Sequence, residues 1–279
     1  MQARSERYPF RGARAIPVLA AKGLPIRGGG ALGWTDGAVL YSRATKGYIM
    51  NEWLLAGQVV LAYGAVVLAW RIFGRAGLYA WSVLATVAAN IEVVVQIRAF
   101  GMDMTLGNVL FASTFLVTDV LSEMCGKAEA NRAVRIGIFG SVCFVAISQM
   151  WLHFVPGAED FALPHMREVF GNTPRIVLAS LGVYAVVQHL DVLLYHAIWR
   201  WTERLGGNHR AWLWVRNNGS TLCSQLANTV LFTYAAFWGT FSQAHLWQIV
   251  WSSLAIFVAT SLLDTPFIYL CRRLPEGKL

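Results

Sequence analysis

The stretch GNVLFASTFLVTDVLSEMCGKAEANR, residues 107–132, decides the fold of this chain. It begins as an apolar helix over 109–117 and then places Asp119 and Glu123 before the apolar run has ended. It stops at Gly126 and continues into basic residues. Ionisable groups inside an apolar segment of membrane length are costly, so they indicate function. We therefore ask what would surround this helix.

Composition places the chain in a membrane. Its 279 residues are 56% hydrophobic and 14% charged, whereas a soluble domain carries about 25% charged residues. This deficit and the repeated long apolar runs predict an integral membrane protein in contact with a lipid bilayer. The net charge of +8 would favour a nucleic-acid partner only in a soluble protein, so we expect none. The four cysteines show no spacing typical of disulfide frameworks or zinc sites.

Residues 1–49 differ from the rest of the chain. They are basic, with only two acidic residues, and consecutive glycines and scattered prolines break any periodicity. We predict a disordered extension over these residues. A second expectation is that the extension is a start-site artefact and that the native chain begins at Met50. In either case residues 50–275 form the membrane domain.

Seven apolar segments follow, and each can span about 30 Å at 1.5 Å per residue. They run over 53–70, 77–97, 107–124, 132–153, 174–199, 219–239 and 246–271. The predicted fold class is therefore all-α, a polytopic transmembrane bundle of about seven helices. The longer loop between the fourth and fifth segments contains Pro156 and Pro164, and we expect a short amphipathic helix there.

Loop charges predict how the bundle is oriented. Lys and Arg gather in the loops after the first, third, fifth and seventh segments, which the positive-inside rule places in the cytoplasm. The carboxyl terminus is then cytoplasmic and the start of the first helix periplasmic. A basic arm before that helix would have to cross the membrane, and a start at Met50 removes this conflict.

Four segments bring an acid or an amide to a similar depth. Counted from the cytoplasmic ends of their helices, Asp119, Asp191, Asn228 and Asp264 lie roughly 8–15 Å deep. A carboxylate at this depth needs a cation, a ligand or a proton, and the helices offer no buried Lys or Arg in the sequence pattern. These four residues are candidate binding residues. Glu123, by contrast, fits an interfacial charge at a helix end.

A repeated spacing adds further candidates. Gln188 and Asp191 are separated by three positions, as are Gln225 and Asn228, so each pair lies on one helix face. That face must point into the bundle, because lipid cannot satisfy these groups. Thr118 beside Asp119, and Asn90 nearer the outer side, complete the candidate set. Interhelical hydrogen bonding is the alternative role for the Gln and Asn side chains.

This set of side chains favours a particular ligand. A carboxylate can accept two parallel hydrogen bonds from a planar N–H edge, amides offer donors and acceptors, and aromatic residues can stack on a flat ring. The residues favour a neutral or cationic polar heterocycle over an anion. His189 and His196 share a face but lack a further ligand, so we expect no metal and no cofactor. Motifs of hydrolases and metalloproteases are missing from the sequence, so we do not expect an enzyme.

Four motifs resemble one family. TLGNVLFASTFLVTDVLSEMCGKAEANRAV from Thr105, RNNGSTLCSQLANTVLF from Arg216, LLDTPFIYLCRRL from Leu262 and NEWLLAGQ from Asn51 resemble the signatures of the queuosine precursor transporters, or vitamin-uptake-like transporters. The resemblance covers about residues 50–275. Cys125 replaces the tyrosine usual before the Gly-Lys turn, and Asn228 stands where many members have aspartate.

The resemblance implies a multi-pass inner-membrane importer with a six-helix core, like that of vitamin-binding S components, plus one amino-terminal helix. The implied small-molecule substrates are 7-cyano-7-deazaguanine and its aminomethyl form, used for tRNA modification. By motif match, Asp119, Gln188, Asp191 and Asn228 would bind them. Alternatives are an importer of another vitamin-like heterocycle, with an ATP-driven partner that the sequence does not indicate, an intramembrane enzyme, or a structural membrane protein.

Overall fold

A computed structural model describes residues 34–171, 174–204 and 212–277, with side chains from residue 49 onward except at 174–177. The described residues from Thr45 onward belong to one compact unit, which is described below. Of the predicted extension, residues 1–33 lie outside the described residues. The described elements are α1 (Trp34–Glu92), β1 (Gln96–Ala99), β2 (Met102–Thr105), α2 (Asn108–Met124), α3 (Lys127–Trp151), α4 (Ala162–Phe170), α5 (Pro174–Arg204), α6 (Leu213–Phe237) and α7 (Gln243–Arg273).

Helix α1 contains the first two predicted segments. It begins at Trp34, so the described part of the predicted extension is helical. It reverses at Gly74, whose φ of 59° and ψ of −138° interrupt the helical backbone in a region that glycine adopts readily. The carboxyl-terminal residues lie against this kink. Gly277 N donates to Trp70 O at 3.1 Å, and Arg75 pairs with Glu276 at 2.9 Å.

A β-hairpin replaces the end of the second predicted segment. We expected helix to residue 97, but it ends at Glu92 and strands β1 and β2 pair antiparallel from Gln96↔Thr105 to Ala99↔Met102. Phe100 and Gly101 both have positive φ, as a tight two-residue turn requires. The segment NEWLLAGQ fastens this hairpin. Asn51 donates to Arg98 O, and Glu52 accepts from Phe100 N, both at 2.9 Å.

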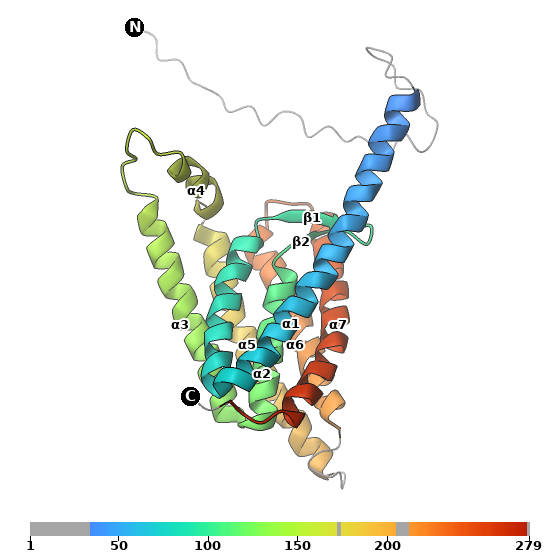
Figure 1. Cartoon of the computed structure of the whole chain (residues 1–279), viewed down its shortest axis with the longest axis vertical. Coiled ribbons are helices and arrows are strands. Elements are labelled where there is room, and N and C mark those ends of the chain that lie inside the picture. The colour runs from blue at the N-terminus through green and yellow to red at the C-terminus, as the bar shows by residue number, and fades with distance from the viewer. Residues whose placement is uncertain (1–33, 172–173, 205–211, 278–279) are drawn as a thin grey trace. The chain divides into compact units, whose positions relative to one another are not determined.

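The remaining segments form the expected helices, including the short α4 in the long loop. Four helical ranges in the described residues are long and apolar enough to cross a membrane, namely Ile49–Glu92, Lys127–Trp151, Leu178–Arg204 and Gln243–Arg273. Helix α2 has 17 residues, and almost all of them are buried. It contacts α3, α5 and α7 (Figure 1). The predicted helical membrane bundle is confirmed, and its central helix is the stretch that contains Asp119.

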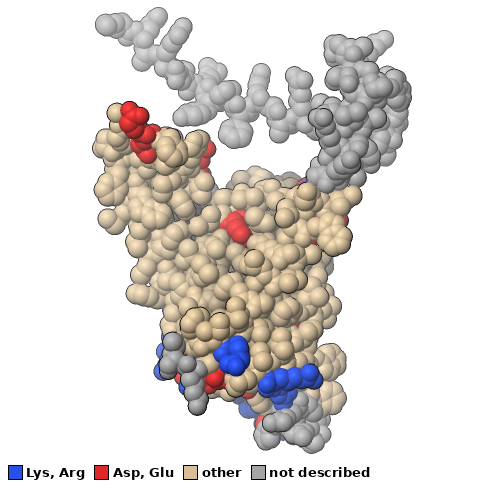
Figure 2. All heavy atoms as spheres, viewed as in Figure 1, with Lys and Arg blue, Asp and Glu red and all other residues tan. Residues whose placement is uncertain are grey.

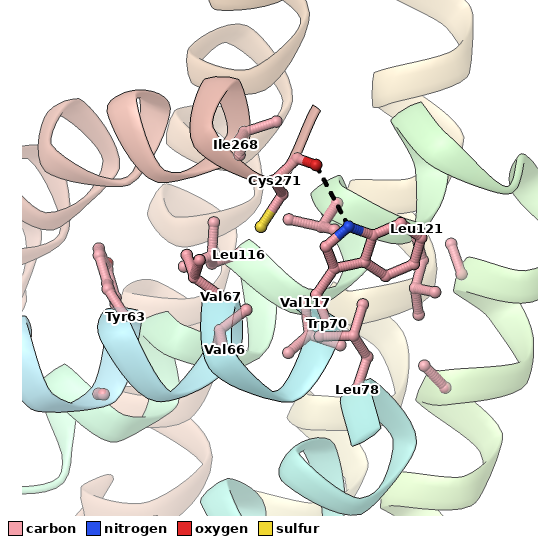
Figure 3. Close-up of a cluster of buried hydrophobic side chains, with 14 of the residues drawn as sticks. Tyr63, Val66, Val67, Trp70, Leu78, Leu116, Val117, Leu121, Ile268 and Cys271 are labelled. Atoms are coloured by element: carbon pink, nitrogen blue, oxygen red, sulfur yellow. Dashed lines mark hydrogen bonds between the residues drawn. The ribbon is translucent and has the colours of Figure 1, made fainter. Parts of the chain in front are cut away.

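An apolar core joins α1, α2 and α7 (Figure 3). Val66 and Trp70 of α1 pack with Leu116 of α2 and Ile268 of α7. The indole of Trp70 donates to Cys271 O at 3.2 Å. Other large apolar side chains are exposed on the outer faces of the helices, including Val60, Leu61, Phe139, Leu226 and Leu262. An exposed apolar surface of this kind fits contact with lipid.

Candidate functional site

The carboxyl groups of Asp119 on α2 and Asp191 on α5 meet inside the bundle. Both residues are fully buried, and their carboxyl groups are close enough to interact electrostatically. Thr221 of α6 donates to Oδ2 of Asp119 at 3.0 Å. Thr118 lies 3.5 Å from Oδ2 of Asp191. Three helices therefore bring hydroxyl groups and carboxyl groups to one point, which we call the acid layer.

Gln188 lies beside the acid layer. Its Nε2 atom donates to Thr114 Oγ1 at 2.5 Å, and its Oε1 atom lies 3.5 Å from the Thr118 hydroxyl. Thr114 and Thr118 are one turn apart on α2, just as Gln188 and Asp191 are nearly one turn apart on α5, so the two polar faces match. The side chain of Gln188 is thereby fixed toward α2.

Asp264 belongs to a neighbouring network between α6 and α7. Asn217 donates to its Oδ1 atom at 2.6 Å and to Thr265 Oγ1 at 3.1 Å. Asn218 also donates to Thr265, at 2.9 Å, and accepts from Ser261 at 3.2 Å. Sequence reasoning missed Asn217 and Thr221 as partners of the acids. Their signal was available, because Asn217, Thr221, Gln225 and Asn228 recur at intervals of three to four residues, which is the period of one helix face.

Several buried oxygen atoms of these residues lack a donor. They are Asp119 Oδ1, Asp191 Oδ1, Asn217 Oδ1 and Gln225 Oε1, for which no described group supplies a hydrogen bond. An unsatisfied buried polar atom costs about 1–3 kcal/mol. A cluster of such acceptors is therefore suited to a ligand rich in N–H donors, or to protons.

A cavity lies nearer the hairpin end of the bundle. It has an empty volume of about 780 Å³, including the part open to solvent. Aromatic rings of Phe111, Tyr184, Phe232 and Phe257 line it together with the amides of Asn90, Asn108 and Asn228. The residues that line it in the described chain include no Lys, Arg, Asp or Glu. A flat, uncharged ring with polar edges would match such walls.

The predicted candidates thus divide between two places. Asp119, Asp191, Gln188 and Thr118 meet in the acid layer, whereas Asn90 and Asn228 line the cavity. Between these sites Phe115 packs with Val183 and Val187, and Phe111 and Phe232 of the cavity wall touch this cluster. We call Phe115, Val183 and Val187 the plug. Gln225, on α6 between Thr221 and Asn228, is also buried.

Comparison with known proteins identifies the family. Residues 105–271 match the model of a family described as "Putative vitamin uptake transporter". The chain belongs to this family. A "Probable queuosine precursor transporter" of Bacillus subtilis (strain 168) is 38% identical over 77% of this chain and 92% of its own length. The "Queuosine precursor transporter" of Escherichia coli (strain K12) is 26% identical over 56% of this chain and 65% of its own length. No solved structure matches the chain.

The vitamin uptake transporter motifs contain one buried cation that the sequence interpretation assigned to a loop. Arg216, at the start of α6, is only 1% exposed, so the expectation that no Arg is buried was wrong. Its guanidinium pairs with Glu123 at 2.8 Å. The Glu123 side chain is 4% exposed, so it is not the solvated interfacial charge that we expected. Helix α2 does end beside Glu123, at Met124, but side chains of α5, α6 and α7 enclose the Glu123 carboxylate.

Proposed function

We propose that this protein imports queuosine precursors, 7-cyano-7-deazaguanine and its aminomethyl form, across the inner membrane. Membership of the vitamin uptake transporter family supports transport. Two relatives whose names specify queuosine precursors support the substrate class. The observation in the molecule that carries the proposal is the cluster of buried acceptor oxygens around Asp119 and Asp191.

The chemistry of a deazaguanine ring matches these acceptors. One edge carries a ring N–H beside an exocyclic NH₂ group, and a carboxylate can accept from both groups at once. Asp119 and Asp191 each keep one oxygen without a donor in the described chain. The free oxygen of Gln225 would accept a further N–H group. Such a site disfavours anionic ligands, because acceptors without donors cannot stabilise negative charge.

The cavity provides a first binding place for the same ring. Its aromatic walls can stack on a base, and Asn90 and Asn228 supply amide groups at its edge. Asn90 is held in place, because it donates to Thr86 O at 2.9 Å and accepts from Ser180 at 2.6 Å. We propose that substrate enters this cavity, passes the plug and reaches the acid layer.

The direction of transport follows from the proposed orientation. Figure 2 shows Lys and Arg gathered at the end of the bundle where α7 ends, opposite the hairpin. By the positive-inside rule this end faces the cytoplasm. The cavity then faces the periplasm, and the acid layer lies between the cavity and the cytoplasm. Import is the direction that this order of sites supports.

A ligand screen by thermal unfolding tests the proposal. Purified protein in detergent should unfold at a higher temperature with either deazaguanine precursor, because a ligand that binds the folded state stabilises it. Guanosine monophosphate, an anion with the same base edge, should give a much smaller shift. Stabilisation by a different vitamin-like heterocycle, with none from the deazaguanines, would contradict the proposed substrate while leaving transport intact.

A further inference from the structure

The buried ion cluster at the cytoplasmic end of the bundle has no part in the substrate site described above. Glu123 of α2 accepts from the guanidinium of Arg216 on α6 and from the hydroxyl of Tyr195 on α5, both at 2.8 Å. Arg272 of α7 lies 3.6 Å from its other carboxylate oxygen. The guanidinium of Arg216 also lies 4.3 Å from the ring centre of Trp199. One carboxylate therefore joins four helices.

Helices α2, α5 and α7 each contribute to this cluster a residue that lies one or two turns further toward the cytoplasm than the buried acid of the same helix. Glu123 follows Asp119 by four residues on α2, and Tyr195 follows Asp191 by four residues on α5. These spacings keep both residues on the face that carries the acid. On α7, Arg272 follows Asp264 by eight residues, again on one face. The cluster therefore lies directly on the path from the acid layer to the cytoplasm.

We propose that the cluster of Glu123, Arg216, Tyr195 and Arg272 is the inner gate of the transporter. This inference rests on the proposed transport function. In the described structure the gate is closed, because the two charges of its central pair are almost fully buried. Substrate bound at the acid layer can reach the cytoplasm only when these four helices separate at this point.

The energetics of a buried ion pair suit a contact that opens and closes better than one that only stabilises the fold. Removing two charges from water costs several kcal/mol per ion, so a buried pair adds little net stability compared with apolar residues. Water that enters on opening solvates both charges and screens their attraction. The pair therefore holds the helices in one arrangement while water is excluded, and little free energy is needed to separate it once water enters. Breaking and reforming of salt bridges accompanies known conformational switches.

Labelling of a cysteine behind the gate tests this proposal without any substrate. The native cysteines are replaced by serine in the full chain, and Ser220→Cys places a thiol one turn beyond Arg216 on α6, where the residue is fully buried. Inside-out vesicles are treated with a membrane-impermeant methanethiosulfonate reagent. We expect Glu123→Gln and Arg216→Gln to accelerate labelling at least tenfold. Tyr195→Phe, which removes one hydrogen bond and no charge, should give a smaller acceleration.

The control is the exposed ion pair at the same end of the bundle. Arg75→Gln breaks its contact with Glu276, in which both side chains are well exposed, and should leave the labelling rate unchanged. If either charge variant fails to fold, the Tyr195→Phe result decides. Unchanged labelling in every folded gate variant, or equal acceleration by Arg75→Gln, would overturn the gate. Because no precursor is used, this outcome is independent of the ligand screen.

Discussion

Thr221 on α6 donates a hydrogen bond of 3.0 Å to Asp119 on α2, and this contact joins two family motifs that lie about 100 residues apart in the sequence. It occupies Oδ2 of the carboxylate and leaves Oδ1 without a donor among the described groups. Asp191 likewise has one carboxylate oxygen, Oδ1, without a donor among the described groups. The proposed mechanism depends on these two free acceptor atoms.

Replacing either acid by its amide should impair transport without unfolding the protein. Asp119→Asn and Asp191→Asn each exchange an acceptor atom for a donor. Loss of one hydrogen bond to a charged group is worth about 1.5–3 kcal/mol, so we expect uptake to fall at least tenfold. The double variant should lose little more than either single variant, because the two carboxyl groups interact and substitutions of interacting residues are not additive. Uptake of labelled precursor into cells measures all three.

The matched control for these acids is Glu168→Gln on α4. This side chain is 81% exposed, so its neutralisation should not affect uptake. Membrane insertion is monitored by the yield of folded protein after detergent extraction. Full uptake by well-inserted Asp191→Asn would remove this residue from the site.

The aromatic wall of the cavity should contribute to affinity. Phe232→Ala removes a ring that lines the cavity and packs against the plug. Stacking of a base on an aromatic ring is worth about 1–3 kcal/mol, so the precursor should bind at least fivefold more weakly. Phe139→Ala is the control, because this ring is 70% exposed on the outer face of α3. Equal precursor affinity in the two variants, measured by titration calorimetry, would argue against the cavity as a binding place.

Close packing of α3 depends on glycine. A Cβ atom at Gly140 would lie 2.6 Å from Val83 Cγ1 on α1, and the branched side chain of valine has little freedom to move. We expect Gly140→Ala to lower the thermal unfolding temperature by several degrees. Gly182→Ala on α5, where nothing lies within 4 Å of the added atom, should leave it unchanged or raise it. An unchanged unfolding temperature for Gly140→Ala would show that α1 and α3 separate easily.

The kink of α1 should likewise require glycine. At Gly74 the backbone has φ of 59°, and an added Cβ atom would lie 2.5 Å from Gly277 O. Gly74→Ala should therefore both strain the backbone and displace the carboxyl-terminal residues, with an expected cost of about 1–3 kcal/mol. Gly64→Ala in the same helix meets nothing within 4 Å and serves as the control. Denaturant unfolding in detergent compares the two variants, and equal stability would contradict the strained kink.

Much of the fold could be predicted from apolar segments and loop charges, whereas the depth of Asn228 in the bundle could not. The sixth segment was expected to begin at residue 219, but α6 begins at Leu213. Counted from this earlier start, Asn228 lies deeper in the bundle. It is seven residues, about 10 Å, beyond Thr221, which contacts Asp119. Depth counting from the later start placed it in the acid layer, and the same error assigned Arg216 to a loop.

The similar depth of Asp119 and Asp191 could be anticipated, because α2 ends at Met124 as expected and α5 ends at Arg204, only five residues beyond the expected residue 199. The hairpin could not, since residues 93–97 are apolar enough to continue a helix, and only the backbone at Phe100 and Gly101 shows the turn. Side-chain partnerships such as Tyr195 with Glu123 depend on helix rotation. A single sequence does not define this rotation, because a membrane helix that is apolar on most sides has no clear amphipathic pattern.

The most direct test of the central claim is restoration of queuosine in tRNA. A bacterial strain that can neither make deazaguanine nor import it is supplied with 7-cyano-7-deazaguanine or its aminomethyl form at low concentration, and queuosine in its tRNA is measured. We predict that queuosine reappears with this protein and is strongly reduced with the Asp191→Asn variant. Absence of queuosine in cells that contain well-folded, membrane-inserted protein would contradict the account.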